Sequence, residues 1–103
     1  MSPEERFEAV AAAHDDPEVT RATMFGSPGL KVNGKVFACF VRERLVVKLP
    51  AERVDALAEA GKGAHFEPGM GKVMREWVAL EPADDWPALA AESRAYVVSL
   101  AKG

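Results

Sequence analysis

The residues in this sequence that could do chemistry are a single cysteine, two histidines and two pairs of aspartates. Cys39 lies in an apolar run between Ala38 and Phe40, where a thiol is typical of a small buried side chain rather than of a nucleophile. His14 and His65 are far apart and lack a cysteine or a second histidine at the spacing of a metal site. We therefore expect neither a metal centre nor a bound cofactor.

The acidic pairs and the glycine-rich segment also have structural interpretations. Asp15-Asp16 precedes a proline and Asp84-Asp85 precedes a predicted helix, and both positions are typical of capping carboxylates. The segment 26–29 lacks the Lys-Ser/Thr pair of a phosphate-binding loop, so we interpret it as a turn. The sequence has no nucleophile elbow, dinucleotide fingerprint or zincin helix. We predict that the protein is not an enzyme.

Basic side chains are the remaining candidates for a binding site. Between Arg21 and Arg75 the chain has ten basic residues and five acids, whereas the segments on either side are acidic. We expect contacts with nucleic-acid phosphates or a partner from Arg21, Lys31, Lys35, Arg42, Arg44, Lys48, Lys72 and Arg75. The alternative is that these charges are simply solvated, which suits a net charge of −3 and a pI near 5.4.

The stretch that must position these residues runs from Met24 to Leu49. Asn33-Gly34 is a strong hairpin signal because both residues tolerate positive φ, and Arg42-Glu43 is a weaker one inferred from the apolar runs beside it. Lys35 and Arg42 lie at these two turns, within reach of a duplex. We predict an antiparallel meander of three strands.

Alternation along the meander predicts which side chains share a face. Residues 36–41 are apolar on both faces, which predicts a central strand with Val36, Ala38 and Phe40 on one side and Phe37, Cys39 and Val41 on the other. Residues 44–49 alternate, with Leu45, Val47 and Leu49 on the core side. The second side of the sheet is therefore expected to be mixed, neither fully polar nor fully buried.

The segments outside the meander are predicted to be helices and further strands. Ser2-Pro3-Glu4-Glu5 is a capped helix start that should end near His14, and a second helix is expected from Pro50 to Gly61. Residues 19–24 and 64–67 have weak extended patterns, and residues 73–80 form a strand containing Trp77. A last helix begins at Asp84 or Asp85, with an apolar stripe of Trp86, Leu89, Ala90, Ser93, Val97 and Leu100.

This order predicts one α+β domain over residues 1–103. Its fold class is a two-layer antiparallel sheet with helices on one face, in the order helix, three strands, helix, one or two strands, helix. No apolar run approaches the roughly 20 residues that span a membrane, and the N-terminus does not look like a secretory signal. With a lone cysteine, these features predict a cytoplasmic protein without a membrane partner.

Several short motifs also occur together in order: Met24-Phe25-Gly26, Gly29-Leu30, Asn33-Gly34-Lys35, Phe37-Ala38, Leu45-Val46-Val47-Lys48-Leu49 and Arg75-Glu76-Trp77-Val78. In order and spacing they resemble the N-terminal domain of TfoX/Sxy proteins and the related MmcQ/YjbR group, over about residues 4–101. The resemblance implies a YjbR-like two-layer fold, similar to that of type III secretion chaperones, and it supplies no catalytic residues.

The resemblance also implies classes of function. TfoX proteins are linked to the regulation of natural competence, and MmcQ/YjbR-like proteins have been described as predicted DNA-binding proteins. The chain departs from full-length TfoX by ending at Gly103, before the C-terminal helical domain of those proteins.

Three hypotheses follow from the sequence. The first is a non-enzymatic regulatory or protein-interaction module that acts through contacts with an unknown partner protein or with a second copy of itself. The second is a nucleic-acid-associated protein that binds DNA weakly through the basic β-meander 21–75. The third is a small-ligand site or a minor enzyme between the loop 68–71 and the sheet, using His65 and Arg75.

Overall fold

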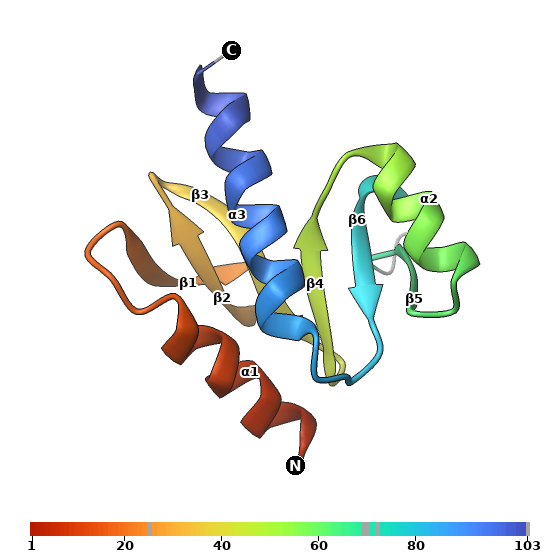
Figure 1. The fold of residues 1–103 in the computed structure, drawn as a ribbon, viewed down its shortest axis with the longest axis horizontal. Coiled ribbons are helices and arrows are strands. Elements are labelled where there is room, and N and C mark those ends of the chain that lie inside the picture. The colour runs from red at the N-terminus through yellow and green to blue at the C-terminus, as the bar shows by residue number, and fades with distance from the viewer. Residues whose placement is uncertain (25, 69–70, 72, 103) are drawn as a thin grey trace.

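The computed structural model describes residues 1–24, 26–68, 71 and 73–102 of the chain (Figure 1). Its elements are α1 (Pro3–Ala13), β1 (Val19–Met24), β2 (Ser27–Val32), β3 (Lys35–Val41), β4 (Arg44–Lys48), α2 (Ala51–Glu59), β5 (Gly63–Phe66), β6 (Met74–Leu80) and α3 (Trp86–Lys102). The predicted order is extended by one strand before α2, because the weakly extended segment 19–24 is a full strand.

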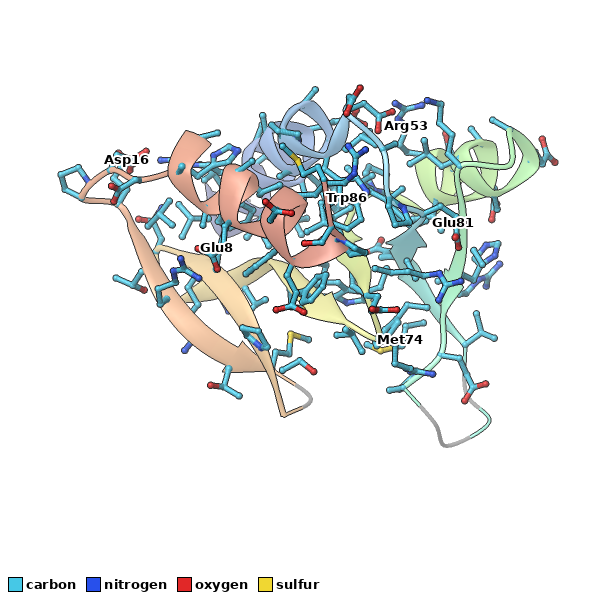
Figure 2. The ribbon with its side chains drawn as sticks, turned by 90° about the horizontal axis from the view of Figure 1, so that it is seen from below. Glu8, Asp16, Arg53, Met74, Glu81 and Trp86 are labelled. Atoms are coloured by element: carbon cyan, nitrogen blue, oxygen red, sulfur yellow. The ribbon has the colours of Figure 1, made fainter. Side chains whose placement is uncertain are left out.

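The strands form one antiparallel sheet in the order β1-β2-β3-β4-β6-β5. The two edges are β1, which pairs with β2 from end to end, and the short β5. The helices lie on one side of the sheet, and the hairpins β1–β2 and β5–β6 extend away from them (Figure 2). The predicted α+β class with helices on one face is confirmed.

The predicted turn over residues 26–29 is too long. Ser27, Pro28 and Gly29 already belong to β2, and Pro28 lies opposite Thr23 of β1. Pairing of β2 with β3 begins at Gly29, so Pro28 lies outside that ladder, where its missing N–H costs little. A Cβ atom at Gly29 would lie 3.0 Å from the carbonyl oxygen of Ala38, so a glycine allows β3 to approach closely.

Both predicted reversals in the meander are two-residue turns. Asn33 and Gly34 have φ angles of 52° and 78°, and Arg42 and Glu43 have 51° and 65°. Positive φ at both central residues matches the right-handed twist of the flanking strands. The turn at Arg42-Glu43 therefore holds two ordinary side chains in the left-handed region, which is why its sequence signal is weak.

A β-bulge in β3 makes the predicted alternation of that strand wrong in part. The register between β2 and β3 shifts between Leu30 and Lys31, so that Leu30 lies opposite Ala38 and Lys31 lies opposite Val36. Phe37 is the extra residue, and it joins Ala38 and Phe40 on the helix-covered side. Val36 moves to the opposite side with Cys39 and Val41.

The main core lies between the sheet and the helices. Every helix contributes to it, for example through Phe7, Val54 and Trp86, which are at most 2% exposed. The Ser2 cap of α1, with Glu5 completing a capping box, is confirmed, and the helix ends at Ala13 with His14 as its C-cap, as predicted. The predicted stripe of α3 is buried except for Leu100, which is 49% exposed because the last turns of α3 extend past the sheet.

Candidate interaction surface on the helix-free face of the sheet

The sheet face opposite the helices carries a second apolar cluster, and we call it the helix-free face. Its buried members are Cys39, Val41, Val46, Phe66 and Trp77, with Met24, Val36, Met74 and Ala79 partly buried around them. Each comes from a strand, and Figure 2 shows Met74 on the side of the sheet away from the helices. The mixed second face expected from the sequence is therefore an apolar floor.

Two cationic side chains cover this floor. The guanidinium of Arg42 lies 5.8 Å from the centre of the Phe66 ring and donates to the carbonyl oxygen of Glu67 at 2.8 Å. The ammonium of Lys48 lies 5.7 Å from the centre of the Trp77 ring. Cations over aromatic faces are attracted by the ring quadrupole, and their methylene stems shield apolar surface. On this face, flexible cationic side chains thus cover the aromatic rings, whereas on the opposite face the helices cover the apolar side chains.

The other predicted cations divide between the two sides of the sheet. Lys31 points to the helix-free face because it alternates with Leu30 and Val32, which belong to the main core. Arg21 lies on the helix side, where it pairs with Glu8 of α1 at 2.8 Å. The predicted set is therefore not brought together as one patch.

The pairing of these cations also differs. Arg44 forms an ion pair with Glu81, and Lys48 lies 4.0 Å from a carboxylate oxygen of Glu76. Within the described part of the chain, Lys31, Lys35 and Arg75 have no ion-pair partner. Lys72 lies outside the described residues.

The cysteine and the two histidines, which were the candidates for chemistry in the sequence, lie in environments typical of structural residues. Cys39 is fully buried, and burial raises the pKa of its thiol to about 12. His14 is buried edge-on against Phe37, while His65 contacts Asp55 of α2 at 2.7 Å. Among the described residues, no three histidine, cysteine or acidic side chains gather as ligands for a metal ion.

The aspartate pairs make long-range ion pairs. Asp16 receives two hydrogen bonds from the guanidinium of Arg94, at 2.8 and 3.0 Å, which lower the pKa of its carboxyl. Asp84 pairs with Arg6 and Asp85 with Lys62. These ion pairs connect α1 and α3 to the segments around them. The sequence indicates only a capping role for the aspartates, so these contacts are not predicted from it.

Charge separates between the sheet and the helical layer. Residues 19–48 and 63–80, which hold the strands and hairpin turns, carry eight of the thirteen basic residues and three of the sixteen acids. The remaining segments carry five basic residues and thirteen acids. The domain is thus acidic on the helical side and basic along the sheet.

The fold and this distribution can be compared with known families. A family model described as the TfoX N-terminal domain matches residues 10–93, which is most of the chain. The chain belongs to the TfoX N-terminal domain family. No curated protein sequence matches it significantly.

Within this TfoX N-terminal domain, the matched range contains the helix-free face, from Met24 to Ala79. It also contains each of the cations predicted from the sequence. None of the helices in the described part of the domain is long and apolar enough to cross a membrane.

The sequence assigned no binding role to the methionines that border this face, and it placed Ser93 only in the apolar stripe of the last helix. Met24 and Met74 border the cluster, and Ser93 of α3 reaches through to the backbone of β3 and β4. A polar residue in the apolar stripe of a helix was the available signal for Ser93. The methionines offered none, because their strand neighbours are polar or irregular in pattern.

Proposed function

We propose that this TfoX N-terminal domain is a non-enzymatic regulatory module that binds a partner protein through its helix-free face. The observation that carries the proposal is an apolar cluster on the sheet face opposite the helices of the described chain, bordered by basic side chains. Protein interfaces typically combine an apolar centre with a polar rim. The partner is expected to offer apolar side chains together with acidic groups.

The residues on this face suit a binding surface that adapts to its partner. Met24 and Met74 are partly buried at the edge of the cluster. Methionine is unbranched and polarisable, and it is common at surfaces that bind several partners. Arg42 and Lys48 can swing away from their rings to pair with acidic groups of a partner, at the cost of weak cation–π contacts.

A photocrosslinking experiment tests this proposal. A photoreactive amino acid is placed at Thr20, which is exposed and lies opposite Lys31, and at Ala88, which is exposed on α3 as a matched control. We expect crosslinks to one partner from position 20 and none from position 88. The partner is then purified and its affinity measured with the Lys31→Glu variant, which should bind an acidic surface more weakly. Equal crosslinking at both positions would contradict the proposal.

The same experiment bears on oligomeric state. We propose that any self-association uses the same face, so that crosslinks from position 20 would join two copies of the chain. Light scattering at several protein concentrations then distinguishes a homodimer from binding to another protein. The single domain over residues 1–103 and a cytoplasmic location remain parts of the proposal.

Nucleic-acid binding is the second candidate, favoured by the basic residues along the sheet. Three cations that form no ion pair with another described residue, Lys31, Lys35 and Arg75, are available for phosphates. Three phosphate contacts would lower affinity roughly 40-fold between 50 and 200 mM salt. Duplex binding with that salt dependence, weakened by Lys35→Glu and Arg42→Glu, would favour this function. If no duplex binds at low salt, nucleic-acid binding is excluded and the protein-interaction function is the one that stands.

A further inference from the structure

The bulge in β3 opens the sheet beside α3. Pairing of β3 with β4 runs from Val41 opposite Arg44 to Ala38 opposite Val47, and it ends where Phe37 interrupts β3. Beyond that point, the hydroxyl of Ser93 in α3 bonds to the backbone of both strands. It donates to the carbonyl oxygen of Phe37 at 2.7 Å and accepts from the N–H of Lys48 at 3.1 Å. The ends of β3 and β4 are therefore held apart.

A hollow of about 410 Å³ lies where these two strands separate. Its walls come from the start of β3, the end of β4, β6 and the last turns of α3, and they include Lys35, Val36, Lys48, Trp77, Val97 and Leu100. Pockets that hold small molecules are typically about 300–1,000 Å³ and mostly apolar, with a few polar groups that orient the ligand. The hollow fits this description.

The charges around the hollow select one kind of ligand. Lys48 lies 4.0 Å from the carboxylate of Glu76, which also accepts a hydrogen bond from the hydroxyl of Tyr96 at 3.1 Å. Glu76 therefore offsets the charge of Lys48. Lys35 has no ion-pair partner in the described part of the chain, and it leaves the hollow with one positive charge that is not balanced.

We propose that this hollow binds a small apolar molecule that carries one carboxylate, such as a medium-chain fatty acid. The apolar part packs against Trp77, Val36 and Val97, and the carboxylate pairs with Lys35. His65 and Arg75, where the sequence suggested a ligand, are not among the residues that line this hollow, and residues 69–70 of the predicted loop lie outside the described residues. The hollow shares Met24, Val36, Lys48 and Trp77 with the helix-free face, but the inference goes beyond the proposed function because its ligand is a small molecule and not a protein.

The two tryptophans of the chain give a direct test. The ring of Trp77 lines the hollow, whereas Trp86 is fully buried in the main core and donates its indole N–H to the carbonyl oxygen of Glu81 at 2.8 Å. Decanoate is added, below its micelle concentration, to the isotope-labelled full chain, and proton–nitrogen spectra are recorded. We expect a saturable shift of the Trp77 indole signal and no shift of the Trp86 signal. Decanol should produce a weaker response, since it lacks the carboxylate.

Substitutions at two positions of the hollow, Lys35 and Leu100, test the role of charge. Lys35→Met should weaken decanoate binding about two- to fivefold, as expected for an exposed ion pair, while Lys31→Met, outside the hollow, should leave it unchanged. Leu100→Asp places a like charge at the exposed rim and should weaken binding more than Leu100→Asn does. Both positions are on the surface, so the variants should fold.

The proposal is overturned by any of three results. The first is a Trp77 signal that does not move with decanoate. The second is a parallel shift of both indole signals, which would indicate a general change in the fold. The third is equal binding of decanoate and decanol with no effect of Lys35→Met. A failure of these tests would leave partner crosslinking from Thr20 unaffected, so the two proposals can fail separately.

Discussion

The two faces of the sheet bury apolar side chains in different ways. On the helix-covered face, Leu45, Val47 and Leu80 lie at most 1% exposed beneath helices that are themselves tied by ion pairs. On the helix-free face, Trp77 and Phe66 are buried beneath the long side chains of Lys48 and Arg42. The two faces therefore do not differ in how deeply they bury apolar side chains. They differ in what covers those side chains, which is helices on one face and long cationic side chains on the other.

This difference determines where another molecule can enter. Exposing the main core requires moving a helix away from the sheet, and the apolar surface that the helix buries there opposes this movement. On the helix-free face, the ring of Trp77 lies beneath the flexible side chain of Lys48, and such a cation–π contact is worth about 0.5–1 kcal/mol at an exposed site. We therefore expect binding, and local opening, on the helix-free face.

The largest expected effect compares the two tryptophans. Trp86→Ala should lower the free energy of unfolding by about 4–5 kcal/mol, because it leaves a cavity beneath the helices and removes the hydrogen bond to Glu81. Trp77→Ala should cost about 3 kcal/mol, because the side chains above it can settle into the space. Urea unfolding of both variants measures the difference. An equal or larger loss for Trp77→Ala would show that the helix-free face is packed as rigidly as the core.

Much of this fold could be predicted from local sequence. The Asn33-Gly34 turn, the capping box of Ser2 and the alternation of residues 44–49 depend on neighbours in the chain, and the structure confirms each of them. Residues 19–24 were recognised only as extended, since a strand with one partner and a mixed pattern gives a weak signal.

The bulge at Phe37 could not be predicted in the same way. Residues 36–41 are apolar throughout, so a shift by one residue leaves the pattern unchanged. What stabilises the bulge is the hydroxyl of Ser93, which lies 56 residues away along the chain. The pairing of the basic residues depends on similar distant contacts, such as Arg44 with Glu81 and Arg94 with Asp16. Composition alone therefore overstated the number of free cations.

Adjacent residues of β4 allow the two faces to be compared within one strand. Val46 and Val47 are both fully buried, but Val46 faces the helix-free cluster and Val47 the main core. In a Cys39→Ala background, Val46→Cys should react with a thiol reagent about a hundredfold faster than Val47→Cys, because local opening exposes only the first. Labelling kinetics, corrected for the stability of each variant, measure this ratio. Equal rates would mean that both faces open only on global unfolding.

Ser93 connects the two faces, and its loss should have a smaller effect. Ser93→Ala leaves the carbonyl of Phe37 and the N–H of Lys48 without their partner, and it should lower the free energy of unfolding by about 1–3 kcal/mol. Ser99→Ala is the control on the same helix, since that hydroxyl is exposed and bonds only to the nearby Tyr96 carbonyl. If Ser93 also shapes the hollow, decanoate binding should change in Ser93→Ala and not in Ser99→Ala. Similar stability of the two variants would contradict this role.

The smallest expected effect is the pH dependence of the helix-covered side. Hydrogen bonds from Arg94 lower the pKa of Asp16 in the folded protein, so this ion pair contributes stability above the unfolded pKa of about 3.9 and the contribution is lost as the pH falls through the folded value. Asp16→Asn should therefore be less stable than the wild type at pH 7 and equal to it at a pH below the folded pKa. Asp15→Asn, at a position without an ion pair in the described chain, should track the wild type throughout. Urea unfolding across this pH range measures both curves. A constant gap between Asp16→Asn and the wild type would mean that the contact between the α1–β1 loop and α3 does not depend on the charge of Asp16.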